Sequence, residues 1–344
     1  MADWKDVVEV EALTAWMNDN GLGSGALEHV TQLTGGTQNV LLRYERDGRA
    51  YVLRRPPKHL RENSNDTMRR EARMLGALAH TDVPHPRLIA ACSDENVLGA
   101  AFYLMEPVEG FNATVALPSL HASSPAIRHA MGLSLVDAIA KLGAVDYDAV
   151  GLHDFGKPEN YLARQVARWR KQLESYAQMP DWPGAGAIPG VEKVAAWLEA
   201  HRPATFTPGI IHGDYHLANV MYRHDGPEIA AVVDWELTAI GDPLIDLGWL
   251  LATWPDAYTP EDKKGVTPWD GFPSAEELVS RYAAGSARDL SHVDWYMVLA
   301  CYKLGILLEG TYARACAGKA PKETGDMLHA ATISLFERAL RNIG

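Results

Sequence analysis

Cysteine is scarce in this chain of 344 residues, which contains only three thiols, Cys92, Cys301 and Cys316. They are widely spaced and form no C-x-x-C pair, so the sequence indicates neither a disulfide framework nor a cysteine-rich metal site. The first residues also lack a basic segment followed by an apolar run, which is the pattern of a secretory signal peptide. A reducing environment is the default for such a chain, and we expect a cytoplasmic protein.

A basic excess is also missing. The 32 Lys and Arg residues are outnumbered by 44 Asp and Glu, which gives a net charge of −12 at pH 7. Because nucleic-acid binding requires a basic face, this balance argues against a nucleic-acid partner. Residues 111–344 hold 20 basic and 28 acidic side chains, a balance that suits a cationic or neutral substrate, although solubility alone also explains a negative surface.

Long apolar runs are absent as well. The most apolar stretch of the later chain, 296–308, is interrupted by Lys303 and is shorter than the roughly 20 residues of a membrane-spanning helix. No membrane partner is therefore expected. The P-loop pattern G-x-x-x-x-G-K-[ST] does not occur, and the glycines of 21–25 follow an expected helix rather than a strand, so they indicate a linker.

The most informative stretch is His212–Asn219, which Asp234 follows fifteen residues later. Phosphoryl transfer requires a carboxylate that orients an attacking hydroxyl and accepts its proton, together with oxygen ligands for Mg²⁺. An Asp, an Asn five positions later and a second Asp have the order of these groups in protein-kinase-like phosphotransferases. We therefore interpret Asp214 as the catalytic base and Asn219 and Asp234 as the metal ligands.

Two short strands are expected between the metal ligands, at 220–223 and 228–233, because both are rich in β-branched and aromatic residues around the turn-forming 224–227. In an antiparallel hairpin, residues at equal distances from the centre of the turn lie opposite each other. For a turn centred between Gly226 and Pro227, Asn219 and Asp234 are such a pair. That register would place Asn219 beside Asp234 at the base of the hairpin, where one cation could bridge them.

Residues 27–105 have the pattern of a sheet with one helix. Strands are expected at 28–33, 40–45, 50–55, 87–92 and 101–105, and a helix from about 65 to 79. The glycine-containing turn between the first two strands can place backbone N–H groups over nucleotide phosphates. Its candidate cofactor-binding residues are Gly35, Gly36, Thr37 and Asn39.

Alternation along the third strand predicts that Val52 and Arg54 share the face turned toward the nucleotide. Arg54 then takes the place of the phosphate-binding lysine of kinases. Glu71, two turns into the expected helix, would pair with Arg54 and hold it toward the phosphates. A solvated charge among neighbouring arginines is the alternative interpretation of Glu71.

The segment 106–110 breaks the strand pattern and predicts a hinge between a nucleotide-binding lobe, 1–105 with an extra N-terminal helix, and a helical lobe, 111–344. The backbone C=O of Glu106 and the N–H of Val108 are candidate adenine contacts, since the proline between them has no N–H. Helices are expected at 4–18 and, in the second lobe, at 125–142, 158–176, 191–201, 291–317 and 322–342.

A different class of site was weighed for His212 and His216, which could form a zinc pair in a hydrolase. The glycine between them and the β-like residues before them disfavour the helical spacing of such sites. No third ligand occurs at close spacing.

Taken together, these residues make the chain resemble the aminoglycoside phosphotransferase and choline kinase family, and most of all the phosphotransferase domain joined to acyl-CoA dehydrogenases. The segments that carry the resemblance are Gly35–Asn39, Tyr51–Pro57, Thr81–Pro84, Phe102–Glu106, His212–Asn219, Asp234–Glu236 and Gly241–Asp246.

The resemblance implies an α+β, bilobal, protein-kinase-like fold with a small antiparallel-sheet lobe and a larger helical lobe. It also implies ATP, or alternatively GTP, bound with Mg²⁺, and transfer of the γ-phosphoryl group to a hydroxyl of a small molecule. By the same match, Asp246 would brace the catalytic loop.

One departure from the family concerns Arg54, where most relatives carry Lys, because Arg binds phosphate as a planar fork rather than a point charge. Arg55 or Lys58 could supply the charge instead, and a nucleotide-binding module without catalysis is the alternative function. The acceptor is open between aminoglycosides, which suit the acidic second lobe, and a hydroxyacyl-CoA or hydroxy acid. An anionic acceptor would require basic residues near the pocket, with Arg164, Arg168 and Arg170 as candidates.

Overall fold

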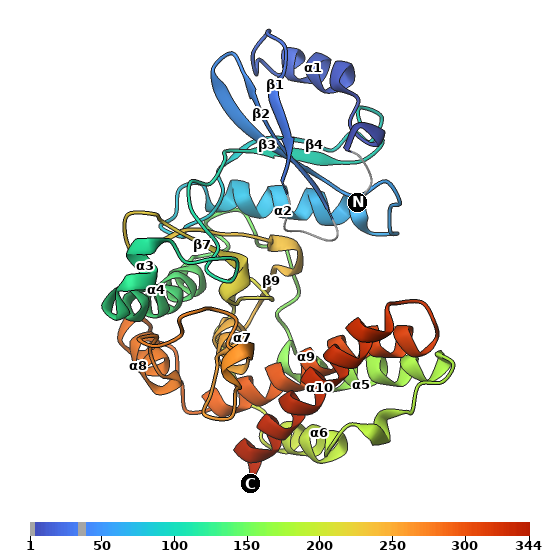
Figure 1. The fold of residues 1–344 in the computed structure, drawn as a ribbon, viewed down its shortest axis with the longest axis vertical. Coiled ribbons are helices and arrows are strands. Elements are labelled where there is room, and N and C mark those ends of the chain that lie inside the picture. Colours follow the sequence, from blue (N-terminus) through green and yellow to red (C-terminus); the bar gives the residue numbers. More distant parts are fainter. Residues whose placement is uncertain (1–3, 34–38) are drawn as a thin grey trace.

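The computed structural model describes residues 4–33 and 39–344 and has two lobes joined by one connector (Figure 1). The smaller lobe contains an antiparallel sheet and the larger one is mainly helical. The α+β bilobal architecture expected from the sequence is therefore confirmed.

The sheet of the small lobe has the strand order β1-β2-β3-β5-β4. Its strands are β1 (Glu28–Gln32), β2 (Val40–Arg46), β3 (Arg49–Arg55), β4 (Leu88–Cys92) and β5 (Phe102–Met105). Helix α1 (Val10–Asp19) covers one face and α2 (Ser64–Leu78) lies against the other (Figure 1). Leu53 and Tyr51 point into the α1 side, which leaves Val52 and Arg54 on the side of α2 and the second lobe.

Two expected helices begin later than their apolar spacing suggested. In place of the start of the helix expected at 4–18, a short 3₁₀ turn occurs at Trp4–Asp6, and α1 begins only at Val10. The helix expected from residue 158 begins as a 3₁₀ turn at Leu162–Arg164 and becomes α5 (Gln165–Ser175) only afterwards. Asn160 has a φ of 56°, a left-handed conformation that a right-handed helix cannot contain.

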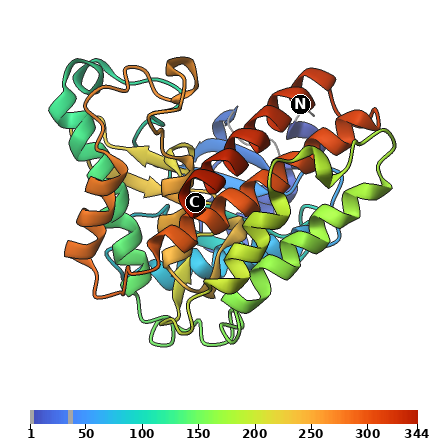
Figure 2. The same ribbon diagram turned by 90° about the horizontal axis from the view of Figure 1, so that it is seen from below.

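The larger lobe packs its helices on both sides of the catalytic segment. Figure 2 shows α5, α6, α9 and α10 gathered on one side and α3, α4 and α8 on the other. Besides α5, these helices are α3 (Ser119–Ser123), α4 (Pro125–Ala144), α6 (Val191–Ala200), α7 (Leu244–Thr253), α8 (Ala275–Gly285), α9 (Val293–Cys316) and α10 (Lys322–Ile343). None of the helices in the described residues is both long and apolar enough to cross a membrane.

The hairpin between the expected metal ligands forms, but its register differs by one residue from the prediction. Strands β7 (Val220–Tyr222) and β8 (Ile229–Val232) pair Val220 with Val232, and a bulge follows before Tyr222 pairs with Ile229. Asn219 therefore lies opposite Val233, whose N–H donates to the Asn219 carbonyl at 2.9 Å. Asp234 is not the partner of Asn219 across the hairpin. The prediction centred the turn between Gly226 and Pro227, but the loop 223–228 has more residues before that point than after it. The residue types of a turn of this length do not fix the strand register.

Candidate active site

The catalytic loop follows β6 (Gly209–Ile211), which pairs with β9 (Ala239–Gly241) beneath the sheet lobe. Asp246, near the start of α7, accepts hydrogen bonds from the backbone N–H groups of His212 at 2.7 Å and Gly213 at 2.8 Å. It is almost completely buried, and burial raises its pKa. The bracing contact expected for Asp246 is thus present in the structure.

Gly213 enters the loop with a φ of 88°, in the left-handed region. A Cβ at this position would lie 2.5 Å from the carbonyl oxygen of Leu237, a distance that atoms do not tolerate. Glycine therefore allows both the sharp turn and the close approach of the 237 backbone. The next residue, Asp214, keeps 31 % of its side chain exposed.

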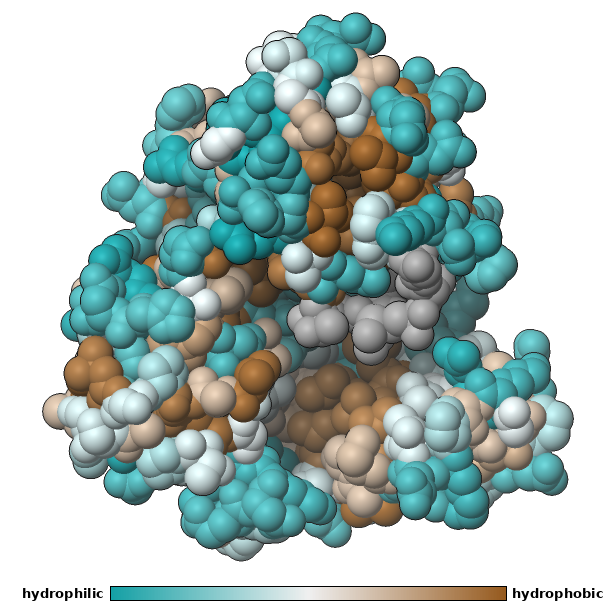
Figure 3. All heavy atoms as spheres, turned by 45° about the horizontal axis from the view of Figure 1, so that its top comes forward, coloured by the Kyte–Doolittle hydropathy of each residue, from teal (hydrophilic) through white to brown (hydrophobic). Residues whose placement is uncertain are grey.

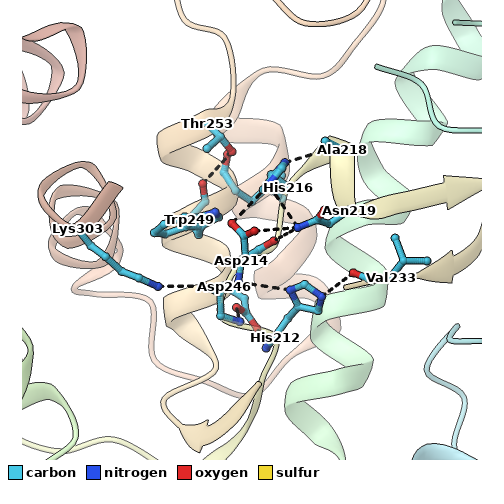
Figure 4. Close-up of polar contacts among 12 residues, drawn as sticks. His212, Asp214, His216, Ala218, Asn219, Val233, Asp246, Trp249, Thr253 and Lys303 are labelled. Carbon is cyan, nitrogen blue, oxygen red and sulfur yellow. Dashed lines mark hydrogen bonds and ion pairs between the residues drawn. The ribbon is translucent and has the colours of Figure 1, made fainter. Parts of the chain in front are cut away.

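Asp214 is held by two neighbours on its own loop (Figure 4). The Asn219 amide donates to the Asp214 backbone oxygen at 2.9 Å and to its Oδ2 at 3.0 Å, and His216 Nε2 lies 3.4 Å from Oδ1. Burial alone would raise the pKa of Asp214, but the hydrogen bond from His216 and the charge of Lys303 lower it overall. Asp214 is therefore an ionised carboxylate at neutral pH, as a proton acceptor must be.

The expected metal ligands expose oxygen atoms suited to a hard cation. Because Asn219 uses its amide nitrogen on Asp214, its Oδ1 is the atom left for a metal. Asp234 follows β8 with a φ of 67° and keeps 39 % of its side chain exposed, while its Oδ1 receives a hydrogen bond from Arg54. Carboxylate and amide oxygens are ligands that Mg²⁺ accepts, so the donor set fits this ion.

Arg54 lies on β3 and reaches both lobes. Its Nε is 2.8 Å from Glu71 Oε2 on α2, and its Nη2 is 2.7 Å from Asp234 Oδ1. Burial lowers the pKa of Arg54, but the charges of Glu71 and Asp234 raise it overall, so the guanidinium is charged. Tyr103 donates to Glu71 Oε2 at 2.8 Å, which leaves this carboxylate fully engaged rather than solvated. The expected Arg54–Glu71 pair is present.

The two other cations considered for this role point elsewhere. Arg55 is buried, with its Nη1 on the backbone oxygen of Val7, and it therefore holds the N-terminal segment against β3. Lys58 lies 4.0 Å from Asp6 at the surface. Neither competes with Arg54 for the Asp234 side of the cleft.

The structure describes some, but not all, of the other residues that were predicted to bind the nucleotide. Val52 is buried beside Met105, across the β3–β5 ladder. Glu106 and Val108 line a cavity of about 640 Å³ between the connector and the β7–β8 turn, which neither Val52 nor Arg54 lines. Asn39 and Glu236 line a second cavity of about 320 Å³ at the start of α2. Gly35, Gly36 and Thr37 lie outside the described residues.

The structure uses the two histidines of the loop differently from a zinc pair. His212 is fully buried, with Nε2 bonded to the Val233 carbonyl at 2.9 Å and Nδ1 accepting from the Asp214 N–H at 3.4 Å. Burial lowers the pKa of His212, so its ring is neutral. His216 accepts from the Ala218 N–H at 3.2 Å through Nδ1, which directs its Nε2 toward Asp214. Both ring nitrogens of His212 thus form hydrogen bonds within the protein.

Two side chains beside Asp214 were not predicted as site residues, His216 and Lys303 (Figure 4). His216 was considered only as a zinc ligand. Lys303 was visible in the sequence as the single charge in an apolar helical stretch, a pattern that often marks a functional residue. By contrast, Arg164 donates to the backbone oxygens of Glu159 and Lys157. Arg170 pairs with Glu192. The third candidate, Arg168, lies over the ring of Trp169, 5.1 Å from its centroid, and its charge contributes to lowering the pKa of Lys303.

Comparison with known proteins agrees with this geometry. Residues 29–279 match the model of a phosphotransferase enzyme family, and this segment includes every site residue predicted from the sequence, whereas Lys303 lies after it. The chain belongs to this phosphotransferase family. Membership indicates a small-molecule kinase, and the acceptor is not identified by the family alone.

Among curated proteins, acyl-CoA dehydrogenase family member 11 of Rattus norvegicus is 31 % identical over 327 residues, which cover 92 % of this chain and 41 % of that protein. The chain thus spans well under half the length of the curated acyl-CoA dehydrogenase relatives that it matches.

Among solved structures, a protein from Ralstonia eutropha JMP134 named as an aminoglycoside phosphotransferase has a TM-score of 0.79 at 32 % identity, covering 97 % of this chain and 98 % of that one. A thermostable mutant of aminoglycoside phosphotransferase APH(4)-Ia, in a ternary complex with AMP-PNP and hygromycin B, has a TM-score of 0.58 at 13 % identity, covering 93 % and 98 %. At that identity the second likeness concerns the fold.

Proposed function

We propose that the protein is a Mg²⁺- and ATP-dependent O-phosphotransferase that moves the γ-phosphoryl group to a hydroxyl of a small molecule. The observation that carries the proposal is the convergence of Asp214, Asn219 and Asp234 with the Arg54–Glu71 pair. Residues 1–105 form the nucleotide lobe, 106–110 the hinge and 111–344 the lobe that binds the acceptor. GTP is the alternative nucleotide.

Each residue has a distinct duty in this reaction. The acceptor oxygen attacks Pγ, the bond between Pγ and the β–γ bridging oxygen breaks, ADP leaves, and the hydroxyl proton passes to Asp214. Arg54 binds the α- and β-phosphates and is held in place by Glu71. Asn219 Oδ1 and Asp234 would hold Mg²⁺, which when bound offsets the negative charge of the phosphates.

The acceptor follows from the relatives rather than from the fold. Seven of the curated proteins that the chain matches are named as acyl-CoA dehydrogenases. One solved structure at comparable identity, 32 %, is named as an aminoglycoside phosphotransferase, and the likeness to APH(4)-Ia, at 13 %, concerns the fold. We therefore propose a hydroxyacyl-CoA or hydroxy acid rather than an antibiotic as the acceptor. A cytoplasmic location would give such an enzyme access to ATP and Mg²⁺.

A hydroxyl-acceptor screen coupled to ADP release tests the proposal, with aminoglycosides, choline-like amines and hydroxyacyl-CoAs compared side by side. Asp214→Ala should reduce turnover by about 10²–10⁴-fold, the range of a general base, while nucleotide affinity changes little. Asp148→Ala, at an exposed position outside the described cavities, is the matched carboxylate control. Unchanged turnover in Asp214→Ala would reject the assigned role.

The alternative, a nucleotide-binding module without catalysis, was motivated by Arg54. Its contacts with Glu71 and Asp234 place a fixed cation where a phosphate-binding lysine would stand, so the substitution by itself gives no reason to expect inactivity. Slow ATP hydrolysis in the absence of an acceptor that disappears in Asp234→Ala would argue against the module.

A further inference from the structure

Lys303 extends from the middle of α9 across the cleft to the catalytic loop (Figure 4). Its Nζ donates to the backbone oxygen of Gly213 at 2.9 Å, and Gly213 directly precedes Asp214. Nζ also lies 4.2 Å above the ring of Trp249 and 5.6 Å from that of Trp169. The ammonium is thus fixed beside the proposed base by contacts from α5, α7 and the loop.

These contacts leave N–H donors of the Lys303 ammonium available to a ligand. An ammonium has three N–H donors, and the Gly213 carbonyl takes one of them. In the described part of the chain, no carboxylate forms an ion pair with Nζ, although Asp214 and Asp246 are close enough to influence it. Burial lowers the pKa of Lys303 to about 8, so the side chain is still mostly protonated at pH 7.

Exposed apolar side chains occur on two segments near Lys303, the loop after Asp234 and helix α9. Figure 3 shows a hollow between the lobes whose floor is apolar. Leu237, next to the loop, and Leu307, one turn after Lys303, are large apolar residues with 47 % and 37 % exposure. An acceptor whose hydroxyl contacts Asp214 beside the Gly213 carbonyl would lie within reach of Nζ.

We propose that Lys303 is an acceptor-binding residue, and that the acceptor carries a carbonyl or carboxylate oxygen a few bonds from the phosphorylated hydroxyl. The oxygen takes one of the remaining N–H donors of the ammonium while the hydroxyl meets Asp214. This inference rests on the proposed phosphotransferase function and narrows its acceptor class. It assigns the recognition of that oxygen to Lys303 rather than to Arg164 or Arg170, which bind elsewhere.

The same residue argues against cationic acceptors. A polyamine such as an aminoglycoside would place its ammonium groups near a fixed like charge in a partly buried site, where repulsion is weakly screened. The net negative charge of the larger lobe favoured such substrates, and Asp214 and Asp246 also lie near Lys303. The Lys303 ammonium, which donates to the carbonyl of the residue before Asp214, is the cation that a second ammonium group beside the proposed base would meet.

Three compounds with one carbon skeleton provide the test: 3-hydroxybutanoate, 3-hydroxybutanamide and 3-hydroxybutylamine, which present an anion, a neutral carbonyl and a cation. ADP release is measured with each compound for the wild type, Lys303→Met, Lys303→Arg and Lys171→Met, an exposed lysine on α5 that serves as the control. Acceptor KM, ATP KM and kcat are determined separately. Where no turnover occurs, inhibition or stimulation of acceptor-free ATP hydrolysis reports binding.

The acid and the amide should be used, or should alter ATP hydrolysis, in preference to the amine. Lys303→Met should raise the acceptor KM for the acid by about tenfold or more, as expected for a lost charged hydrogen bond, with little change in ATP KM. Lys303→Arg should recover part of this loss, and Lys171→Met should behave as the wild type.

If ATP turnover depends on Asp214, any of three results would overturn the inference. The first is a preference for the amine, and the second is that neither the acid nor the amide affects the enzyme. The third is a Lys303→Met variant that loses kcat with every compound while its acceptor KM is unchanged. The last result would assign Lys303 to bracing the Gly213 backbone. Absence of any Asp214-dependent ATP turnover would instead reject the proposed function itself.

Discussion

Arg54 Nη2 donates to Asp234 Oδ1 at 2.7 Å, although 180 residues separate the two in the chain. This contact joins β3 of the small lobe to the residue that follows β8 in the large lobe. The same guanidinium binds Glu71, so one side chain connects the sheet, α2 and the proposed metal ligand. Arg54 is therefore a direct contact between the small lobe and the proposed metal ligand.

Replacing Arg54 by Met should affect stability and activity together. Glu71 is 1 % exposed and would be left as an unpaired buried carboxylate, which costs about 3–5 kcal/mol in the free energy of unfolding. Denaturant unfolding measures the loss, with Arg54→Lys as the charge-conserving control. The double variant Arg54→Met/Glu71→Met should regain most of the stability but not the turnover. Stability that stays low in the double variant would contradict this account.

Asp246→Ala should inactivate the protein, although Asp246 has no proposed contact with the substrate. The substitution leaves the N–H groups of His212 and Gly213 without their acceptor in a buried site, at about 1–3 kcal/mol each. The loop that presents Asp214 would shift, so kcat should fall strongly while ADP affinity, measured by calorimetry, is retained. A variant with wild-type kcat would show that the loop holds its shape without this brace.

Gly213→Ala tests the close approach of two backbones. Both Gly213 and Gly48, in the β2–β3 turn, have positive φ, at 88° and 74°, but an added Cβ meets the Leu237 oxygen only at Gly213 and nothing within 4 Å at Gly48. Gly48→Ala should cost about 1–2 kcal/mol from the backbone conformation alone. Gly213→Ala should cost more and should reduce kcat. Equal losses in the two variants would indicate that the contact with residue 237 is unimportant.

The lowered pKa of Lys303 predicts a pH dependence of stability. Between its folded pKa of about 8 and the ordinary value of 10.5, the unfolded chain binds a proton that the folded protein does not. The free energy of unfolding should therefore rise with pH across this window, by on the order of 2 kcal/mol, relative to a variant without the group. Denaturation of the wild type and Lys303→Met from pH 7 to 10 measures the difference. A difference that is constant with pH would contradict the lowered pKa.

Chelation of divalent cations should abolish ADP release if Asn219 and Asp234 hold Mg²⁺. Asp234→Asn keeps the shape of the side chain and removes its charge, so the Mg²⁺ concentration for half-maximal turnover should increase by about tenfold or more. Asp148→Asn, at an exposed position outside the described cavities, is the control. An unchanged Mg²⁺ requirement in Asp234→Asn would place the metal elsewhere.

Where prediction from sequence failed, the errors have local causes. The register of β7–β8 was wrong by one residue at its base, because Tyr222 pairs with Ile229 and the turn is therefore centred one residue earlier than assumed. The bulge between Met221 and Tyr222 recovers only part of this offset. The helix before Gln165 began too early in the prediction, since apolar spacing does not report the left-handed backbone of Asn160.

The sequence by itself determined the order of the elements and the identity of the reactive groups, because strand alternation, helical spacing and the offsets among Asp214, Asn219 and Asp234 are local properties of the chain. Only the tertiary structure decided which charges meet. Arg54 joins Asp234, and Lys303 reaches Gly213, across 180 and 90 residues. Such pairings depend on how the lobes and helices pack, and packing is fixed by the shape of the whole core rather than by any one segment.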